Sequence, residues 1–126
     1  MNHLLSILIP TKNRQFYCLK TVHHLLSLNL NKVEIIIQDN SDDDILRREL
    51  ETEIGDGKVV YSYSNEKLNF SQNFQLPLAK VTGEYFMFIG DDDSVNPEII
   101  RILTYFRDKK AEAIVQSFPL YFVYPN

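Results

Sequence analysis

The sequence is poor in cysteine and glycine, and these shortages exclude several kinds of site. Cys18 is the one cysteine among 126 residues. A disulfide within the chain is therefore excluded, and no cysteine–histidine spacing typical of a zinc site is present. The four glycines form neither of the familiar glycine-rich phosphate loops. The lack of paired cysteines favours a reducing compartment.

An excess of positive charge and a long apolar run are also missing. Acidic residues outnumber basic ones by 17 to 13, which gives a net charge of -4. This balance argues against nucleic acid as the main partner, because phosphate-backbone binding needs a basic face. No apolar run approaches the roughly 20 residues of a transmembrane helix, and the first ten residues lack the basic start of a signal peptide. We expect a cytoplasmic protein and leave open peripheral contact with a membrane.

What the sequence does contain is an alternation of strand and helix patterns. Hydrophobic residues make up 44% of the chain, enough for the core of a single domain over residues 1–126. The alternation predicts an α/β fold with a mostly parallel sheet flanked by helices. The expected strands cover residues 4–10, 33–38, 59–64, 85–89 and 113–124. The expected helices cover residues 15–28, 43–54, 71–80 and 97–110. Cys18 falls on the apolar face of the first helix and is expected in the core.

Polar residues collect where the expected strands end. Ligands of open parallel sheets bind beyond the carboxyl ends of the strands, where the strand order reverses. With the order 3-2-1-4, residues 11–14, 39–41 and 91–93 would meet in one crevice beside Pro10. The sequence therefore predicts a ligand site at that end of the sheet.

The sharpest feature is the acidic run Asp91-Asp92-Asp93. Adjacent carboxylates repel one another unless solvent or a cation lies between them. In an extended segment, Asp91 and Asp93 would face the same way and address one metal ion. Mg²⁺ or Mn²⁺ held by one or two carboxylates plus substrate phosphates suits this pattern. The alternative is an acidic loop that only caps the following helix.

Two further positions have both a functional and a structural interpretation. Asp39 follows an apolar strand, and its carboxylate either accepts a hydrogen bond from a nucleobase or forms an Asx turn near Ser41. Arg14 either pairs with a phosphate or only begins the first helix at the surface. Thr11 and Asn13 lie in the same loop as Arg14.

Five segments together resemble the family 2 nucleotide-diphospho-sugar glycosyltransferases of the GT-A fold. They recur in that family's order and approximate spacing. The segments are residues 6–14 (SILIPTKNR), 34–41 (EIIIQDNS), 69–73 (NFSQN), 83–88 (GEYFMF) and 90–97 (GDDDSVNP). The resemblance implies a Rossmann-like nucleotide-sugar-binding half with sheet order 3-2-1-4.

The resemblance also implies roles for individual residues. Thr11 would lie against the nucleotide, Asp39 would recognise the base, and Asn73 would lie nearby. The acidic run would be the DXD-type signature of the family, with Asp93 as a direct ligand of Mn²⁺ or Mg²⁺ and Asp91 as a second ligand. The expected nucleotide-sugar-binding set is Pro10, Thr11, Asn13, Arg14, Asp39, Asn73, Asp91 and Asp92. The implied reaction is inverting transfer of a sugar, with UDP as the first choice of nucleotide, to a carbohydrate or lipid-linked acceptor in polysaccharide biosynthesis.

This sequence departs from the family pattern in two ways. Lys12 stands where members often have an aromatic residue against the base. The family's catalytic base is an acid well beyond the DXD signature, so we expect it beyond Asn126, in an acceptor-binding part that this chain lacks.

Three other functions compete with this interpretation. A nucleotidyltransferase would carry a glycine-rich loop after the first strand, where residues 10–14 have no glycine. A receiver-type signalling domain would carry an acidic pair there instead. A non-catalytic nucleotide-binding module derived from a glycosyltransferase fits the short chain.

Overall fold

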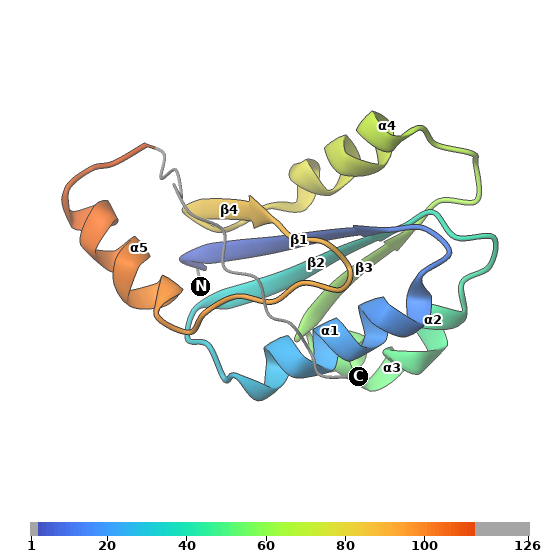
Figure 1. Ribbon diagram of the computed structural model, residues 1–126, viewed down its shortest axis with the longest axis horizontal. Helices are drawn as coiled ribbons and strands as arrows, with labels where there is room; N and C mark the ends of the chain where they lie inside the picture. Colours follow the sequence, from blue (N-terminus) through green and yellow to red (C-terminus); the bar gives the residue numbers. More distant parts are fainter. Residues whose placement is uncertain (1–2, 113–126) are drawn as a thin grey trace, which may run out of the picture.

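The computed structural model describes residues 3–112, which form a four-stranded sheet flanked by helices (Figure 1). All strand pairs are parallel and the strand order is β3-β2-β1-β4. The strands are β1 (Leu5–Thr11), β2 (Val33–Asp39), β3 (Val59–Tyr63) and β4 (Tyr85–Phe88). The predicted fold class and the order 3-2-1-4 are confirmed. The strand expected over residues 113–124 lies outside the described residues.

Helices cover both faces of the sheet. They are α1 (Gln15–Ser27), α2 (Ile45–Glu49), α3 (Glu51–Gly55), α4 (Phe70–Gln75), the 3₁₀ helix η1 (Leu76–Lys80) and α5 (Ile99–Asp108). Figure 1 shows α1, α2 and α3 beneath the sheet, α4 above it and α5 towards the end where β4 begins. Within residues 3–112, no helix combines the length and the apolar character that crossing a bilayer demands.

The two central strands are buried on both faces, and the face towards α1 is the more apolar one. Ile7, Ile9, Ile35 and Ile37 belong to the core cluster that also contains Cys18 of α1. Leu8 and Ile36, on the opposite face, have no exposed surface either. Burial raises the pKa of the Cys18 thiol, which keeps it protonated and unreactive. The prediction of a core cysteine is confirmed.

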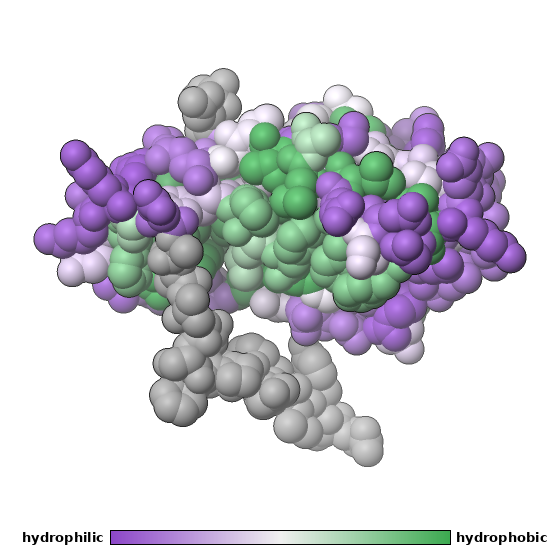
Figure 2. Space-filling view, turned by 90° about the horizontal axis from the view of Figure 1, so that it is seen from above, coloured by the Kyte–Doolittle hydropathy of each residue, from purple (hydrophilic) through white to green (hydrophobic). Residues whose placement is uncertain are grey.

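The face under α4 is less completely covered than the face under α1. Figure 2 views the molecule from the α4 side and shows apolar side chains gathered over the middle of this face. The large apolar side chains that α4, η1 and β4 leave exposed are Phe70, Leu76, Leu78 and Phe86. The rings of Phe70, Phe74 and Phe88 pack in series, with centroid distances of 4.2 and 5.1 Å.

Three helices differ from the sequence expectation, two of them for an identifiable local reason. The helix expected over residues 71–80 changes to 3₁₀ geometry around Pro77, which has no N–H to continue an α-helical ladder. The helix expected over residues 43–54 is divided at Leu50. The helix expected from Pro97 starts at Ile99, because the Asn96 side chain accepts from the Glu98 N–H and caps a turn before it.

The strand register brings the polar strand ends level with one another. Thr11 and Asp39 are direct partners in the β1–β2 ladder. Leu8 pairs with Phe88 in the β1–β4 ladder, and Asp91 follows Phe88 by the same three residues that separate Thr11 from Leu8. The register therefore places Thr11 between Asp39 and Asp91.

At the opposite end of the sheet, a buried carboxylate links neighbouring segments of the chain. Glu34 of β2 accepts hydrogen bonds from the Ser6 hydroxyl and from the backbone N–H and hydroxyl of Thr82. His3 lies 3.4 Å from its other oxygen. Burial raises the pKa of Glu34, but the hydrogen bonds from Ser6 and Thr82 outweigh it, so the pKa lies below its ordinary value. Glu34 therefore ties β1 and the turn before β4 to β2.

Replacing this carboxylate is expected to weaken the fold in a pH-dependent way. Because folding lowers the pKa of Glu34, its stabilisation is present above the unfolded-state pKa of about 4.3 and is lost as the pH falls through the lower folded-state value. Glu34→Gln should cost about 1 kcal/mol at pH 7, since a charge-assisted acceptor becomes neutral. The difference from wild type should vanish in strong acid. Urea denaturation between pH 7 and pH 2.5 measures it. Glu66→Gln, which changes an exposed glutamate, should show no such loss, and equal losses in both variants would contradict the assignment.

Candidate functional site

The polar strand ends meet as the strand order requires. The Thr11 hydroxyl at the end of β1 donates to Asp91 Oδ2 at 2.9 Å, across 80 residues of sequence. The Thr11 backbone pairs with Asp39 on its other side. The Asn73 side chain of α4 donates to the Thr11 carbonyl oxygen at 3.2 Å. Four segments of the chain therefore converge on the carboxyl end of β1.

Asp91 points inward and is held by several donors. Its side chain accepts from Thr11 Oγ1 and, at 2.8 Å, from Arg14 Nε. Its carbonyl oxygen accepts from the Thr21 hydroxyl of α1 at 2.9 Å. Only 7% of the residue is exposed. In this arrangement Asp91 anchors the acidic run to β1 and α1.

Asp92 and Asp93 lie on the outer side of the same loop. Both are exposed. Asp93 N donates to the Gly90 carbonyl oxygen and Asp93 Oδ2 accepts from Gly90 N, at 3.1 and 2.8 Å. The run is therefore a tight turn rather than the extended segment that the sequence analysis assumed, so the i, i+2 argument for Asp91 and Asp93 does not apply to this geometry.

Gly90 leaves the space that the outer carboxylates use. A Cβ atom at this position would lie 2.6 Å from Asp93 Oδ2 and 3.3 Å from Asp92 Oδ1. Asp92 Oδ1 and Asp93 Oδ2 therefore both lie beside the position that a Cβ atom of residue 90 would occupy. Sequence reasoning assigned no role to Gly90, although a glycine directly before three acids was a visible signal.

The exposed carboxylates suit a hard divalent cation that keeps other ligands. Within residues 3–112, no group of three or more histidine, cysteine or acidic side chains is arranged to enclose a metal. Mg²⁺ and Mn²⁺ do not need such an enclosure, because one or two carboxylates and substrate phosphates suffice. Asp92 and Asp93 offer oxygen ligands of this kind at an open edge.

Asp39 is more enclosed than the sequence suggested. It has no exposed surface and accepts from Tyr61 OH at 2.7 Å, from Ser41 N at 2.9 Å and from Gln15 Nε2 at 3.4 Å. Burial, and then the Asp39 carboxylate, raise the pKa of the Tyr61 phenol, so the phenol remains a donor. The Asx turn with Ser41 is present. Gln15 makes the longest of the three contacts and is the donor most easily replaced by a ligand.

Asn13 connects two loops of the site. It has a left-handed backbone (φ 54), a conformation that asparagine tolerates better than most residues. Its N–H donates to Ser41 Oγ at 2.8 Å and its side-chain oxygen accepts from Asp42 N at 2.9 Å. Asn13 therefore fixes the loop after β1 against the loop after β2.

Asn73 presents an unused acceptor. The side chain is buried, and its Nδ2 donates to the Thr11 carbonyl oxygen. Its Oδ1 has no hydrogen-bond partner, the one such buried side-chain atom found within residues 3–112. Unpaired buried acceptors are rare and costly, so this oxygen is positioned to accept an N–H or O–H from a ligand.

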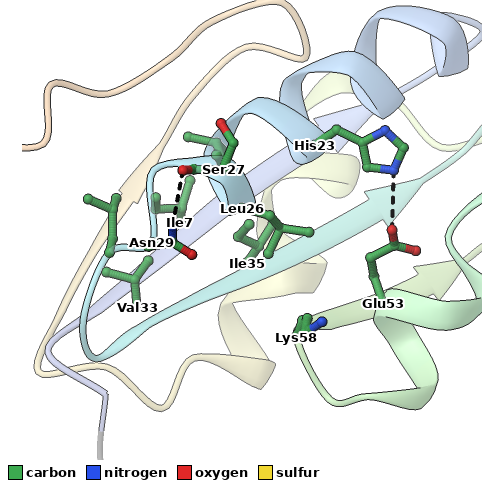
Figure 3. Close-up of a pocket in the computed structure, with 11 residues that line it drawn as sticks. Ile7, His23, Leu26, Ser27, Asn29, Val33, Ile35, Glu53 and Lys58 are labelled. Carbon is green, nitrogen blue, oxygen red and sulfur yellow. Dashed lines mark hydrogen bonds and ion pairs between the residues drawn. The ribbon is translucent and has the colours of Figure 1, made fainter.

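A hollow lies at the end of the strands opposite to these residues (Figure 3). It has a volume of about 580 Å³ and lies between the end of α1, the start of β2 and α3. His23 and Glu53 in its wall lie 3.3 Å apart, and Lys58 pairs with Asp56 outside it. None of the residues predicted to bind a ligand lines it. The site at the carboxyl ends of the strands therefore remains the better candidate.

Comparison with known proteins decides the family. The sequence model of glycosyl transferase family 2 matches residues 6–126. The chain belongs to this family. The glycosyltransferase GlyG of Streptococcus pneumoniae is 24% identical over 120 residues, which are 94% of this chain and 40% of that protein. The GalNAc(5)-diNAcBac-PP-undecaprenol beta-1,3-glucosyltransferase of Campylobacter jejuni is 30% identical over 93 residues, which are 72% of this chain and 30% of that protein.

Solved structures share the fold of this family 2 chain. TarS 1–349 of S. aureus matches with a TM-score of 0.63 at 19% identity, over 90% of this chain and 38% of that one. TarS 1–349 in complex with UDP-GlcNAc matches with a TM-score of 0.56 at 22% identity, over 83% and 31%. The GT-A fold is thus confirmed. The match to glycosyl transferase family 2 argues against the nucleotidyltransferase and receiver-domain alternatives. The chain spans less than half the length of the curated relatives that it matches.

Proposed function

We propose that this chain is the donor-binding part of a metal-dependent, inverting glycosyltransferase that transfers a sugar from a UDP-sugar to an acceptor hydroxyl. The observation that carries the proposal is the convergence of Thr11, Asp39, Asn73 and the acidic turn 91–93 at one end of the sheet in a family 2 chain. UDP is favoured because TarS structures are described in complex with UDP and with UDP-GlcNAc.

The acceptor is proposed to be a carbohydrate or a lipid-linked saccharide. The name of the Campylobacter relative describes transfer to an undecaprenol-linked saccharide. A lipid-linked acceptor would bring the enzyme to a membrane surface from the cytoplasm, which agrees with a role in polysaccharide biosynthesis.

Each residue of the site would make a different contact with the donor or with its neighbours. Asn73 Oδ1 would accept a hydrogen bond from the nucleotide and so satisfy its own unpaired oxygen. Asp39 would accept from the base edge in place of Gln15. Thr11, next to Pro10, would keep Asp91 in position through its hydroxyl.

The acidic turn would place charge beside the diphosphate. A bound Mg²⁺ or Mn²⁺ would neutralise the charge that develops on the leaving nucleotide. Asp93 is the proposed direct ligand, because the residue is exposed and its bond to Gly90 N uses only Oδ2. Asp91 as a second ligand stays a prediction from the family resemblance. Its side chain is held by Thr11 Oγ1 and Arg14 Nε, whereas that of Asp92 is 57% exposed and is the more accessible partner for Asp93.

Calorimetry with nucleotides tests this proposal. The wild-type chain should bind UDP more tightly than GDP, and only with Mn²⁺ present. Asp93→Asn should lower the UDP affinity at least about 10-fold, because the asparagine oxygen can still accept from Gly90 N while the charge is lost. Asp108→Asn, at an exposed aspartate that ends α5, is the matched control.

Two outcomes would contradict different parts of the proposal. Equal UDP affinity in wild type and Asp93→Asn would remove the metal role of Asp93. Failure of the wild-type chain to bind either nucleotide, with or without Mn²⁺, would remove the donor site itself.

A further inference from the structure

Arg14 forms a bridge between the inner and outer carboxylates of the acidic turn. Its Nε donates to Asp91 Oδ1 at 2.8 Å and its Nη2 donates to Asp92 Oδ2 at 2.6 Å. The guanidinium also lies over the Tyr17 ring, 4.7 Å from its centroid. One side chain therefore neutralises two of the three acids and stacks on an aromatic ring.

The position of Arg14 is fixed by its backbone. It directly precedes α1, and its carbonyl oxygen accepts from the Cys18 N–H in the first turn of that helix. Tyr17 lies three residues further on, on the same side of the helix. The backbone of Arg14 therefore stays in place while its side chain can change partners.

The two ion pairs of Arg14 differ in how easily they can be exchanged. The Asp91 side chain is only 10% exposed, whereas that of Asp92 is 57% exposed. An exposed ion pair contributes little and is readily replaced, but a buried partner is costly to abandon. The bond to Asp92 is thus the one that a ligand can displace.

Arg14 also competes with a cation for the same oxygens. A guanidinium within hydrogen-bond distance of Asp91 and Asp92 repels a divalent ion that approaches them. The planar fork of arginine binds phosphate as well as it binds carboxylate. When a nucleoside diphosphate and a cation bind together, the cation would therefore bind the carboxylate that Arg14 releases, and the diphosphate would bind Arg14.

We propose that Arg14 is a positioning residue that exchanges a carboxylate for a phosphate. Without donor it holds Asp91 and Asp92. When a divalent cation and a nucleoside diphosphate bind, Arg14 keeps Asp91, releases Asp92 to the cation and pairs with the diphosphate. The acidic turn would thus bind the cation weakly until the nucleotide is present. This inference rests on the proposed function of the site.

Two titrations on the 126-residue chain test the exchange. Mn²⁺ alone is titrated by electron paramagnetic resonance, and UDP with saturating Mn²⁺ is titrated by calorimetry. Arg14→Gln should bind Mn²⁺ alone about 5-fold more tightly, because a competing charge is gone. It should bind UDP with Mn²⁺ about 10-fold more weakly, because the diphosphate loses a charged partner. The exchange therefore predicts that the affinity for Mn²⁺ alone rises while the affinity for UDP falls. A purely structural defect would lower both affinities.

Two further variants sharpen the test. Arg14→Lys keeps the charge without the fork, so its affinity for Mn²⁺ alone should stay near wild type and its UDP affinity should be partly restored. Arg101→Gln removes the same charge from an exposed pair with Glu98 on α5 and should change neither titration. Melting curves show that each variant is folded.

The outcomes separate this inference from the proposed function. If wild type binds Mn²⁺ and UDP but Arg14→Gln leaves the affinity for Mn²⁺ alone unchanged or weaker, the exchange is overturned and the donor site stands. If wild type binds neither, the donor site fails and the exchange fails with it.

Discussion

Asp39→Ala is expected to lower the free energy of unfolding by about 3 kcal/mol and to abolish UDP binding. The carboxylate has no exposed surface and accepts from Tyr61 OH, Ser41 N and Gln15 Nε2. Alanine leaves the buried Ser41 N–H and the half-buried Tyr61 hydroxyl without this partner, and an unsatisfied buried donor costs about 1–3 kcal/mol. Urea denaturation measures the loss of stability, and calorimetry measures the loss of UDP binding.

Two milder variants separate the structural role of Asp39 from recognition of the base. Tyr61→Phe removes one donor and should cost about 1 kcal/mol while UDP binding persists. Asp39→Asn keeps an oxygen for Ser41 N and should be more stable than Asp39→Ala, yet it should bind UDP weakly. Asp39→Ala with wild-type stability would show that the hydrogen bonds around this carboxylate contribute nothing to the fold.

The second large effect is expected at Gly83, where the turn before β4 touches β1. A Cβ at this position would lie 2.7 Å from Ser6 N, Ser6 Oγ and the Tyr85 carbonyl oxygen. Two of these atoms belong to the backbone and cannot rotate away. Gly83→Ala should therefore cost about 2–3 kcal/mol and lower the melting temperature by about 10 °C. Thermal denaturation followed by circular dichroism measures it.

Gly55→Ala is the matched control for this substitution. No atom lies within 4 Å of a Cβ built at Gly55, and its φ is not positive. Alanine there should leave the melting temperature unchanged or raise it slightly, because it restricts the unfolded chain. If Gly83→Ala and Gly55→Ala have the same melting temperature, the close contact at Gly83 does not constrain the fold.

The sheet could be predicted from sequence because its strongest signals are local. The short, isoleucine-rich runs of β1 and β2 are typical of strands buried on both faces. Because parallel strands end on the same side of a sheet, the polar residues at their carboxyl ends lie at one edge of the sheet for any conformation of the loops. Convergence of Thr11, Asp39 and Asp91 followed from strand order alone, and the structure confirms it.

The side-chain pairing within the site was beyond sequence reasoning. Arg14 and Asp91 are 77 residues apart, and nothing in their spacing distinguishes an ion pair between them from a phosphate contact. Tyr61 was expected only as part of a strand, yet it donates to Asp39. The acidic run was assumed to be extended, but the bonds between Gly90 and Asp93 make it a turn. Such choices depend on tertiary contacts that a single sequence does not display.

The central place of β1 has a consequence for the order in which this chain acquires a binding site. Pairing of β1 with β4 joins Leu5 to Tyr85, so it closes a far longer loop than pairing of β1 with β2, which joins Leu5 to Val33. Longer loops carry a larger closure entropy and form later. A state in which only β1, β2 and β3 have paired would have Asp39 beside Thr11 but would lack the bond between Thr11 and Asp91. If the chain binds a nucleotide-sugar as proposed, the ligand would bind only the sheet in which β4 is paired and would stabilise that state by mass action.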